Sequence, residues 1–181
     1  MAIAASDIKV KLSVKTGSAG NSTAQGNVNN SLGKYISTTE ITDNTLNNLF
    51  DDISGAENAA STVDYRCIFI HNSHASLTYQ SAKVYLSAEV SGGASIAIAV
   101  DNVAASAIGS SSAQAEEIAN ETTAPTANGG FSAPTTTGGA LSLGDIAAGS
   151  CKAIWVRRTA ANSAAKDNDG VTLTIFGDTA A

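Results

Sequence analysis

The side chains with the most reactive chemistry in this chain are its two cysteines and two histidines. Cys67 and His71 fall on one predicted strand, and His74 follows three residues later. Thiolate sulfur and imidazole nitrogen are preferred ligands of Zn²⁺, but a structural site needs four ligands in a tetrahedron. The pattern offers no fourth ligand at a suitable place. We therefore predict a strand end followed by a polar turn, and no metal site.

The two cysteines lie far apart in the sequence. Cys67 and Cys151 each fall on a strand that is predicted to face inward. Buried free cysteines pack as small apolar side chains, and this is the interpretation we favour. A disulfide between the two strands needs Cα atoms about 4.4–6.8 Å apart. The sequence leaves that alternative open.

Two glycines have the spacing of a phosphate-binding loop. Gly144 and Gly149 are followed by Ser150 and Cys151, where such a loop needs lysine and then serine or threonine. Lys152 comes two places too late, and the next segment is predicted to be a strand rather than a helix. The segment is therefore predicted to be a turn between two strands, with no nucleotide cofactor.

A short acidic stretch resembles the middle of a calcium loop. Asp167, Asp169 and Gly170 have suitable spacing, but the first ligand position falls on Ala165 and no glutamate closes the loop. Side chains of this type also form Asx turns, which is the structure we predict here.

No arrangement of residues points to catalysis. The G-x-S-x-G motif of serine hydrolases is absent. The adjacent carboxylates Asp51/Asp52 and Glu116/Glu117 diverge on any helix or strand, so neither pair would flank one substrate bond. We predict no catalytic, cofactor-binding or metal-binding residues, and a protein that is not an enzyme.

The composition excludes several further classes. The 181 residues carry a net charge of -6, only 14% are charged, and 33 of the apolar residues are alanine. Scattered lysines and arginines in an acidic chain argue against nucleic acid as a partner. No apolar run approaches the ~18 residues of a membrane span, and the N-terminus lacks the basic and apolar regions of a secretory signal. A folded domain with a thin core is the expected result.

Alternating apolar and polar residues predict about eight short strands. The central one, 63–71, has Cys67 and Phe69 on one face and Ile68 and Ile70 on the other, as expected for a strand buried on both sides. The others are predicted at 8–14, 35–41, 82–90, 95–100, 140–146, 151–158 and 171–177. With no βαβ alternation, the predicted fold is an all-β antiparallel sandwich, jelly-roll-like, formed by one domain over residues 1–181.

One short helix and two long polar segments complete the predicted domain. Leu46, Leu49, Phe50 and Ile53 share one helical face, with Thr42 or Asp43 as the cap and Gly55 as the stop. This stripe would plug one end of the core. Residues 16–33 are predicted to be a long loop or arm, and residues 104–140 a long, partly irregular excursion.

Arg66 and Arg157 are charged residues within otherwise apolar strands. We expect them to pair with carboxylates or to lie at an interface, because unpaired buried charges are rare.

Two stretches resemble segments of small structural proteins of tailed bacteriophages: NNLFDDISGAENAASTVDYRCIFIHN (47–72) and LSLGDIAAGSCKAIWVRRT (141–159). Among these proteins, the two segments are most similar to capsid decoration, or cement, proteins. The resemblance implies a β-sandwich or jelly-roll subunit, often a homotrimer, that is made in the host cytoplasm. Such a subunit binds the major capsid protein on the outer capsid surface of the virion and stabilises it.

Two other functions remain open on the sequence alone. One is a tail- or fibre-associated virion subunit. The other is a carbohydrate-binding β-sandwich, for which Trp155 and the tyrosines are the available aromatic residues. The resemblance does not assign contact residues.

Overall fold

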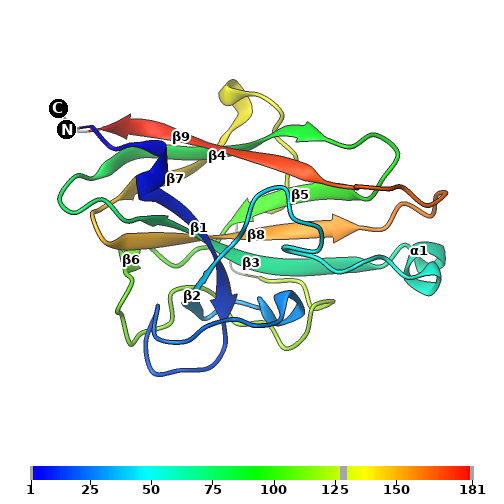
Figure 1. The fold of residues 1–181 in the computed structure, drawn as a ribbon, viewed down its shortest axis with the longest axis horizontal. Helices are drawn as coiled ribbons and strands as arrows, with labels where there is room; N and C mark the ends of the chain where they lie inside the picture. Colours follow the sequence, from blue (N-terminus) through cyan, green and yellow to red (C-terminus); the bar gives the residue numbers. More distant parts are fainter. Residues whose placement is uncertain (1, 127–129, 180–181) are drawn as a thin grey trace.

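A computed structural model describes residues 2–126 and 130–179. Within them the chain is mostly strand (Figure 1). The strands are β1 (Ile8–Val14), β2 (Tyr35–Glu40), β3 (Val63–Asn72), β4 (Tyr79–Glu89), β5 (Ser95–Val100), β6 (Ser106–Ala107), β7 (Leu141–Ile146), β8 (Ser150–Thr159) and β9 (Val171–Thr179). The helices are α1 (Gly55–Ala60) and the 3₁₀ turns η1 (Ala5–Asp7), η2 (Val28–Asn30) and η3 (Thr137–Gly139).

The strands form two antiparallel sheets, as predicted for an all-β sandwich. The large sheet has the order β2-β1-β3-β8-β5, with β6 also paired to β8, and the small sheet has the order β7-β4-β9. All eight predicted strands are present, and β6 is an additional short strand inside the predicted excursion. β3 and β8 pair without a register break from Val63↔Thr159 to Asn72↔Ser150. Side chains of this central pair therefore point to both faces of the large sheet.

Each face of the large sheet has its own apolar core. The inner core lies between the two sheets and includes Ile68 and Ile70 of β3 together with Ile154 and Val156 of β8. The outer core lies on the opposite face and includes Cys67, Phe69, Cys151, Ala153 and Trp155. The alternation predicted for these strands is thus confirmed, and it requires a second cover for the outer face.

That cover is a layer of irregular chain, which we call the loop layer: residues 16–33 and 108–126. Leu32, Ala115 and Ile118 from this layer are buried in the outer core. Backbone hydrogen bonds join the two segments, from Ile118 N to Leu32 O and from Gly20 N to Ser110 O. Residues 16–33 therefore form a loop folded on their own chain, and residues 127–129 of the predicted excursion lie outside the described residues.

Gly33 marks the closest approach within the loop layer. Its φ is +93°, and a Cβ atom built there would lie 1.8 Å from the carbonyl oxygen of Glu116. Gly33→Ala is expected to lower the free energy of unfolding by at least ~2 kcal/mol, because a left-handed backbone alone costs a side chain about 1–2 kcal/mol. Urea denaturation measures the loss.

Gly109→Ala is the matched control for Gly33→Ala, since a Cβ atom at Gly109 meets nothing within 4 Å. This variant is expected to unfold at nearly the same urea concentration as the native protein. Equal midpoints for both variants would show that the loop layer does not pack as described.

The predicted helix over 46–53 is wrong in its position. Residues 41–54 are turns and bends, with left-handed backbone at Asn44 and Asn47, which a continuous helix does not permit. The helix follows at Gly55–Ala60, where Ser54 and Glu57 form a capping box, so Gly55 begins it. The predicted role survives in part: Leu49 and Phe50 pack against the inner core, whereas Leu46 is 71% exposed.

Candidate functional site

The carboxylate of Asp101, just after β5, is buried and accepts three hydrogen bonds from different parts of the chain. Its oxygens accept hydrogen bonds from the indole Nε1 of Trp155 at 2.8 Å, from Glu116 N at 3.0 Å and from Val103 N at 2.8 Å. Asp101 is 1% exposed and Trp155 is fully buried. The Asp101 side chain thus connects Trp155 of β8 to Val103, just after β5, and to Glu116 in the loop layer.

Lys152 adds a buried cation next to this carboxylate. Its Nζ donates to the carbonyl oxygens of Asp101 at 2.7 Å and Val103 at 2.5 Å. Burial lowers the pKa of the Lys152 ammonium, and the negative charge of Asp101 opposes that shift. The ammonium donates its hydrogen bonds to backbone carbonyl oxygens, and it thereby stabilises the turn after β5.

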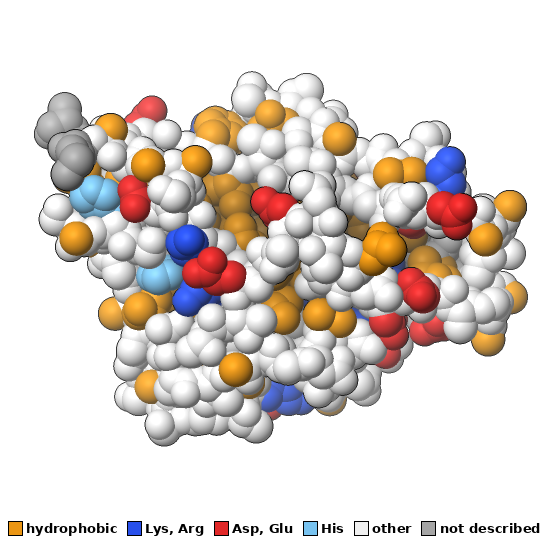
Figure 2. Space-filling model, in the orientation of Figure 1, with side chains coloured by type: hydrophobic (Ala, Val, Ile, Leu, Met, Phe, Trp, Pro, Cys, Tyr) orange, Lys and Arg blue, Asp and Glu red, His pale blue; other side chains and the backbone are white. Residues whose placement is uncertain are grey.

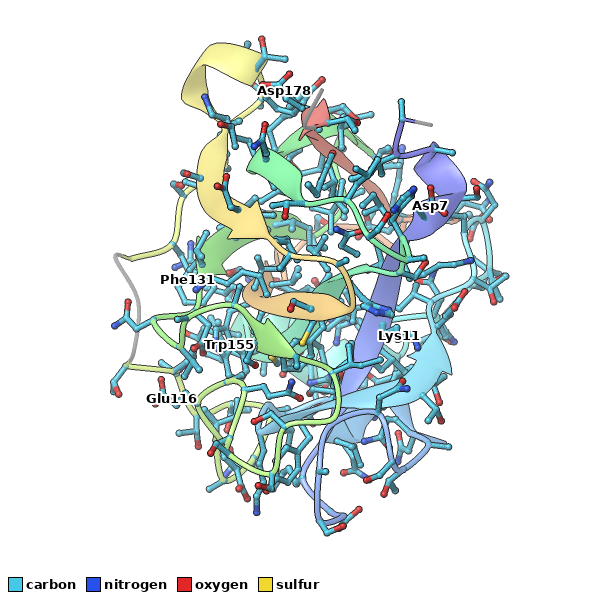
Figure 3. The ribbon with its side chains drawn as sticks, turned by 90° about the vertical axis from the view of Figure 1, so that its left-hand side faces the viewer. Asp7, Lys11, Glu116, Phe131, Trp155 and Asp178 are labelled. Carbon is cyan, nitrogen blue, oxygen red and sulfur yellow. The ribbon has the colours of Figure 1, made fainter. Side chains whose placement is uncertain are left out.

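Gln114 is a third polar side chain buried in this region. Its Oε1 accepts from Ile36 N at 3.1 Å, while its Nε2 donates to Ala107 O at 2.8 Å and approaches the Cys151 sulfur at 3.3 Å. The amide therefore joins the loop layer to β2, β6 and β8. Figure 3 shows Trp155 and Glu116 on this side of the large sheet.

A cluster of arginines surrounds Phe50 next to the inner core. The guanidinium carbons of Arg66 and Arg158 lie 5.1 Å and 4.7 Å from the centroid of the Phe50 ring. Both arginines are buried and come from the central strands β3 and β8. The aromatic ring of the 41–54 loop therefore closes this end of the inner core by stacking on cations.

Carboxylates neutralise both of these arginines. Arg158 Nη2 lies 2.8 Å from Asp64 Oδ2, and Arg66 Nη2 lies 2.6 Å from Glu121 Oε2. The prediction that Arg66 is paired is confirmed. Arg157 instead lies 5.2 Å above the Phe131 ring, and no carboxylate pairs with it in the ranges 2–126 and 130–179.

Asp51 joins the cluster from the loop. Its Oδ2 accepts from Asn29 Nδ2 at 2.9 Å and its Oδ1 lies 3.3 Å from Arg158 Nη2. Burial acts to raise the pKa of Asp51, but the bond from Asn29 and the charges of Arg158 and Arg66 together hold it below the ordinary value. Asp51 therefore stays charged and fixes the loop to the sheet.

His71 is the buried imidazole with the least hydrogen bonding. It is 6% exposed, and neither ring nitrogen has a hydrogen-bond partner. Burial is the main cause that lowers the pKa of His71; Lys11 and Lys9 lower it further, and Glu40 opposes them. The two lysines lie on β1, which pairs with β3, and Glu40 lies on β2, on the far side of β1.

The buried imidazole is expected to make stability depend on pH. The unfolded chain binds a proton near the ordinary histidine pKa of about 6.5, whereas the folded chain binds it only at lower pH. Stability is therefore complete above pH 6.5 and declines below it, by about 1.4 kcal/mol for each unit between the two pKa values. Urea denaturation at pH 7.5 and 5.5 measures the decline.

The His71→Phe variant removes this titration while keeping a ring of similar shape. Its stability should fall less between pH 7.5 and 5.5 than that of the native chain. An identical fall in both proteins would show that His71 does not cause the pH dependence.

The cysteines are unbonded, which answers the question that the sequence left open. Cys67 pairs in register with Trp155, and Cys151 pairs with His71, so the two thiols lie four residues apart along neighbouring strands. Burial raises the pKa of Cys151 to about 12 and that of Cys67 well above the ordinary value. Both thiols are therefore neutral packing groups, as favoured from the sequence.

The zinc candidates do not converge. Cys67 and His71 face the outer core, whereas His74 lies beyond the strand, where its Nδ1 accepts from Ser76 N at 3.1 Å and Leu77 N at 3.0 Å. Groups of three or more side chains that could hold a metal ion are absent from residues 2–126 and 130–179.

The predicted turn between two strands is present at residues 147–149, and the acidic stretch also contains a turn. Gly149 has positive φ in the connection between β7 and β8, whereas Gly144 has positive φ within β7, where it pairs with Ala82. Asp169 accepts from Ala94 N at 2.6 Å and so fastens the turn before β9 to the start of β5.

The carboxylate pairs diverge, as expected for neighbours in sequence. The Glu116 carboxylate accepts from Thr126 N at 2.8 Å, whereas Glu117 lies 3.3 Å from Lys34 Nζ. Asp51 faces the arginines while Asp52 is exposed. In each pair, the two carboxylates thus have different surroundings.

Aromatic surfaces suited to a sugar ring are few in the described chain. Trp155 is fully buried and cannot stack on a ligand. A half-buried Tyr85–Phe176 pair, with centroids 5.9 Å apart, lies on β4 and β9. A shallow cavity of about 280 Å³ beside β5 and β7 is lined by Val100, Gly130, Phe131, Ser132, Leu141 and Ser142, and none of these residues is ionisable.

The sequence analysis missed Asp101, Lys152 and Gln114, the residues that hold the loop layer. Their types are common on protein surfaces, and only their place in the fold distinguishes them. No protein-family model matches the chain, and comparison with curated proteins and with solved structures gave no significant match. A helix long and apolar enough to cross a membrane is absent from the described residues.

Proposed function

We propose that this protein is a non-enzymatic virion structural protein that binds the outer surface of a phage capsid and stabilises it. The observation that carries the proposal is the pairing of β3 with β8. These strands lie within the two segments, 47–72 and 141–159, that resemble phage structural proteins, and they pair residue by residue along their full length. The two segments therefore contain the central strand pair of the large sheet.

The use of the buried polar groups supports a structural role. Asp101, Lys152, Arg66 and Arg158 each bind loop backbone or loop carboxylates, which fixes irregular segments on the sheet. Within the described residues, the loop layer is thus fastened to the sheet by these bonds. A rigid surface loses little conformational entropy when it binds a lattice of identical subunits.

The proposed partners are the major capsid protein and further copies of this chain, as a homotrimer. Cosedimentation with expanded and precursor capsids that lack the protein tests the proposal. We expect saturable binding to expanded capsids only, with a fixed number of copies per lattice unit. Binding to purified tails instead would favour a tail subunit, and failure to bind any virion part would contradict the proposal.

Light scattering on the purified protein at micromolar concentration tests the trimer separately. A mass of three chains is expected, since one chain has a mass of 18.1 kDa. A monomer at all concentrations would contradict the homotrimer.

A further inference from the structure

Three of the four sheet edges are protected against pairing with another strand. Residues 21–25 cover β2, through Asn21 N to Ile36 O and Thr38 N to Thr23 O. Ser132 covers β5 with two hydrogen bonds to Ile98. β7 is short and contains Gly144 at positive φ beside two register shifts. Cover, shortness and bulges are the usual protections of edge strands.

The free edge of β9 is neither short nor covered along its length, and the two register shifts in its pairing with β4 have their extra residues on β4. The strand is nine residues long, VTLTIFGDT, and contains no proline, no lysine or arginine and only one charge, Asp178. It pairs with β4 on one side. Across the described chain, no hydrogen bond between backbone groups reaches its other side. An exposed, uncharged strand edge of this length is a template for a further strand.

The two open sides of the sandwich also differ. On the β5–β7 side, the segment Ser132–Pro134 bridges the sheets, since Ser132 bonds to Ile98 and Pro134 O accepts from Leu86 N at 2.8 Å. On the β1–β9 side, the 41–54 loop bonds to the large sheet, through Ile41 N to Val10 O, but forms no hydrogen bond with β9. On this second side, the N-terminal segment reaches the last residue of β9, where Ile3 N donates to Thr179 Oγ1 at 3.3 Å, and residues 171–178 are left without a bridging segment.

Apolar side chains line this second side without being fully covered. Figure 2 shows them at the bottom of a hollow below β9 and beside β1. Ile8 and Val10 of β1 and Leu173 and Ile175 of β9 face the inner core but are only partly buried. A strand paired to β9 would place every second side chain on these residues.

We propose that the free edge of β9 and this hollow accept an extended strand from another protein chain, with apolar residues at alternate positions and basic residues at its ends. The bordering elements carry Asp7, Asp43 and Asp178, whereas the lysines of β1 point to the other face, where Lys9 lies 3.5 Å from Glu40 and Lys11 donates to Asn21. The charge at the border is therefore acidic and suits a basic segment. Figure 3 shows Asp7 and Asp178 on this part of the molecule.

A second folded copy fits this place poorly. Three strands spaced about 4.8 Å apart span about 10 Å, whereas five span about 19 Å, so the large sheet extends beyond the small one. Because β7 contacts β5 and β8, the part of the large sheet that extends beyond the small sheet lies on the β1–β2 side. Pairing two copies through β9 would bring both overhanging sheets into the same space, while a single strand fits beside the overhang. This inference does not depend on a capsid as the partner.

The probe for the experiment is an acetylated, amidated peptide, Lys-Val-Thr-Val-Thr-Val-Thr-Val-Lys, added to the ¹⁵N-labelled protein. Amide shifts and hydrogen-exchange protection are expected over residues 171–179. A peptide with alternate amides N-methylated on the β9-facing side should not bind, because it lacks the backbone donors. A peptide of the same composition with its valines contiguous should bind at least tenfold more weakly.

Two protein variants locate the binding surface. Val10→Lys places a charge in the hollow and is expected to weaken binding about tenfold, whereas Thr172→Lys lies on the solvent side of β9 and should bind within twofold of the native protein. Equal binding of the N-methylated peptide, or shifts at β2 or β5 instead, would overturn the proposal. Concentration-dependent protection of 171–179 without peptide would overturn it in favour of a second copy.

Discussion

Replacing Asp101 with alanine is expected to lower the free energy of unfolding by about 3–5 kcal/mol, the usual cost of removing one partner from a buried charged cluster. The variant leaves the indole N–H of Trp155 and the backbone N–H of Glu116 without their acceptor, and it removes the negative charge near Lys152. Urea denaturation followed by tryptophan fluorescence measures the loss, since Trp155 is the single tryptophan.

Two variants control the Asp101 experiment. Asp101→Asn keeps a carbonyl oxygen as acceptor and should lose less stability than Asp101→Ala. Asp52→Ala removes an exposed carboxylate and should change stability by no more than about 0.5 kcal/mol. A loss below about 1 kcal/mol for Asp101→Ala would contradict the role of this cluster in holding the loop layer.

The second large effect is expected at the buried ion pair between Asp64 and Arg158. The two side chains are 4% and 7% exposed and their charged atoms lie 2.8 Å apart. Asp64→Ala should lower the free energy of unfolding by about 3–5 kcal/mol, because the Arg158 guanidinium then stays buried without the carboxylate closest to it. Glu40→Ala, which breaks the more exposed pair with Lys9, should cost about 0–1 kcal/mol.

A double variant distinguishes the effect of charge pairing from the effect of packing at this buried site. Asp64→Leu combined with Arg158→Met replaces both charges with apolar side chains, and such replacements are often neutral. We expect the double variant to recover most of the stability that Asp64→Ala loses, to within about 2 kcal/mol of the native protein. A double variant as unstable as Asp64→Ala would show that packing around Phe50, rather than charge pairing, stabilises this end.

The strands could be predicted from the sequence because their signal is local. Ile68 and Ile70 alternate with Cys67 and Phe69, and each set belongs to a different core. Strand positions thus follow from period-two alternation with small errors at the ends. The order of the strands in the sheets does not follow from this pattern.

The helix error has a specific cause. Leu46, Leu49 and Phe50 have helical spacing, but Leu49 and Phe50 are packed by a loop whose asparagines adopt left-handed backbone. Spacing alone does not distinguish a helix from a loop that packs two residues in succession. The capping box at Ser54 and Glu57 was the local signal for the real helix.

The polar side chains that hold the loop layer could not be predicted in the same way. Asp101 and Gln114 are buried because segments far apart in the sequence meet around them, at separations of 54 residues to Trp155 and 78 to Ile36. The pairing of Arg66 was predictable because a charge inside an apolar strand requires a partner, although Glu121 itself was not identified. Sequence patterns thus indicate the need for a partner more readily than its identity.

Electron cryomicroscopy of expanded capsids with and without the added protein tests the proposed function most directly. We expect extra density at one repeated position on the outer capsid surface, shaped to fit the two-sheet sandwich and arranged around threefold axes. Density confined to the tail, or maps that are identical with and without the protein, would contradict a capsid-binding structural role.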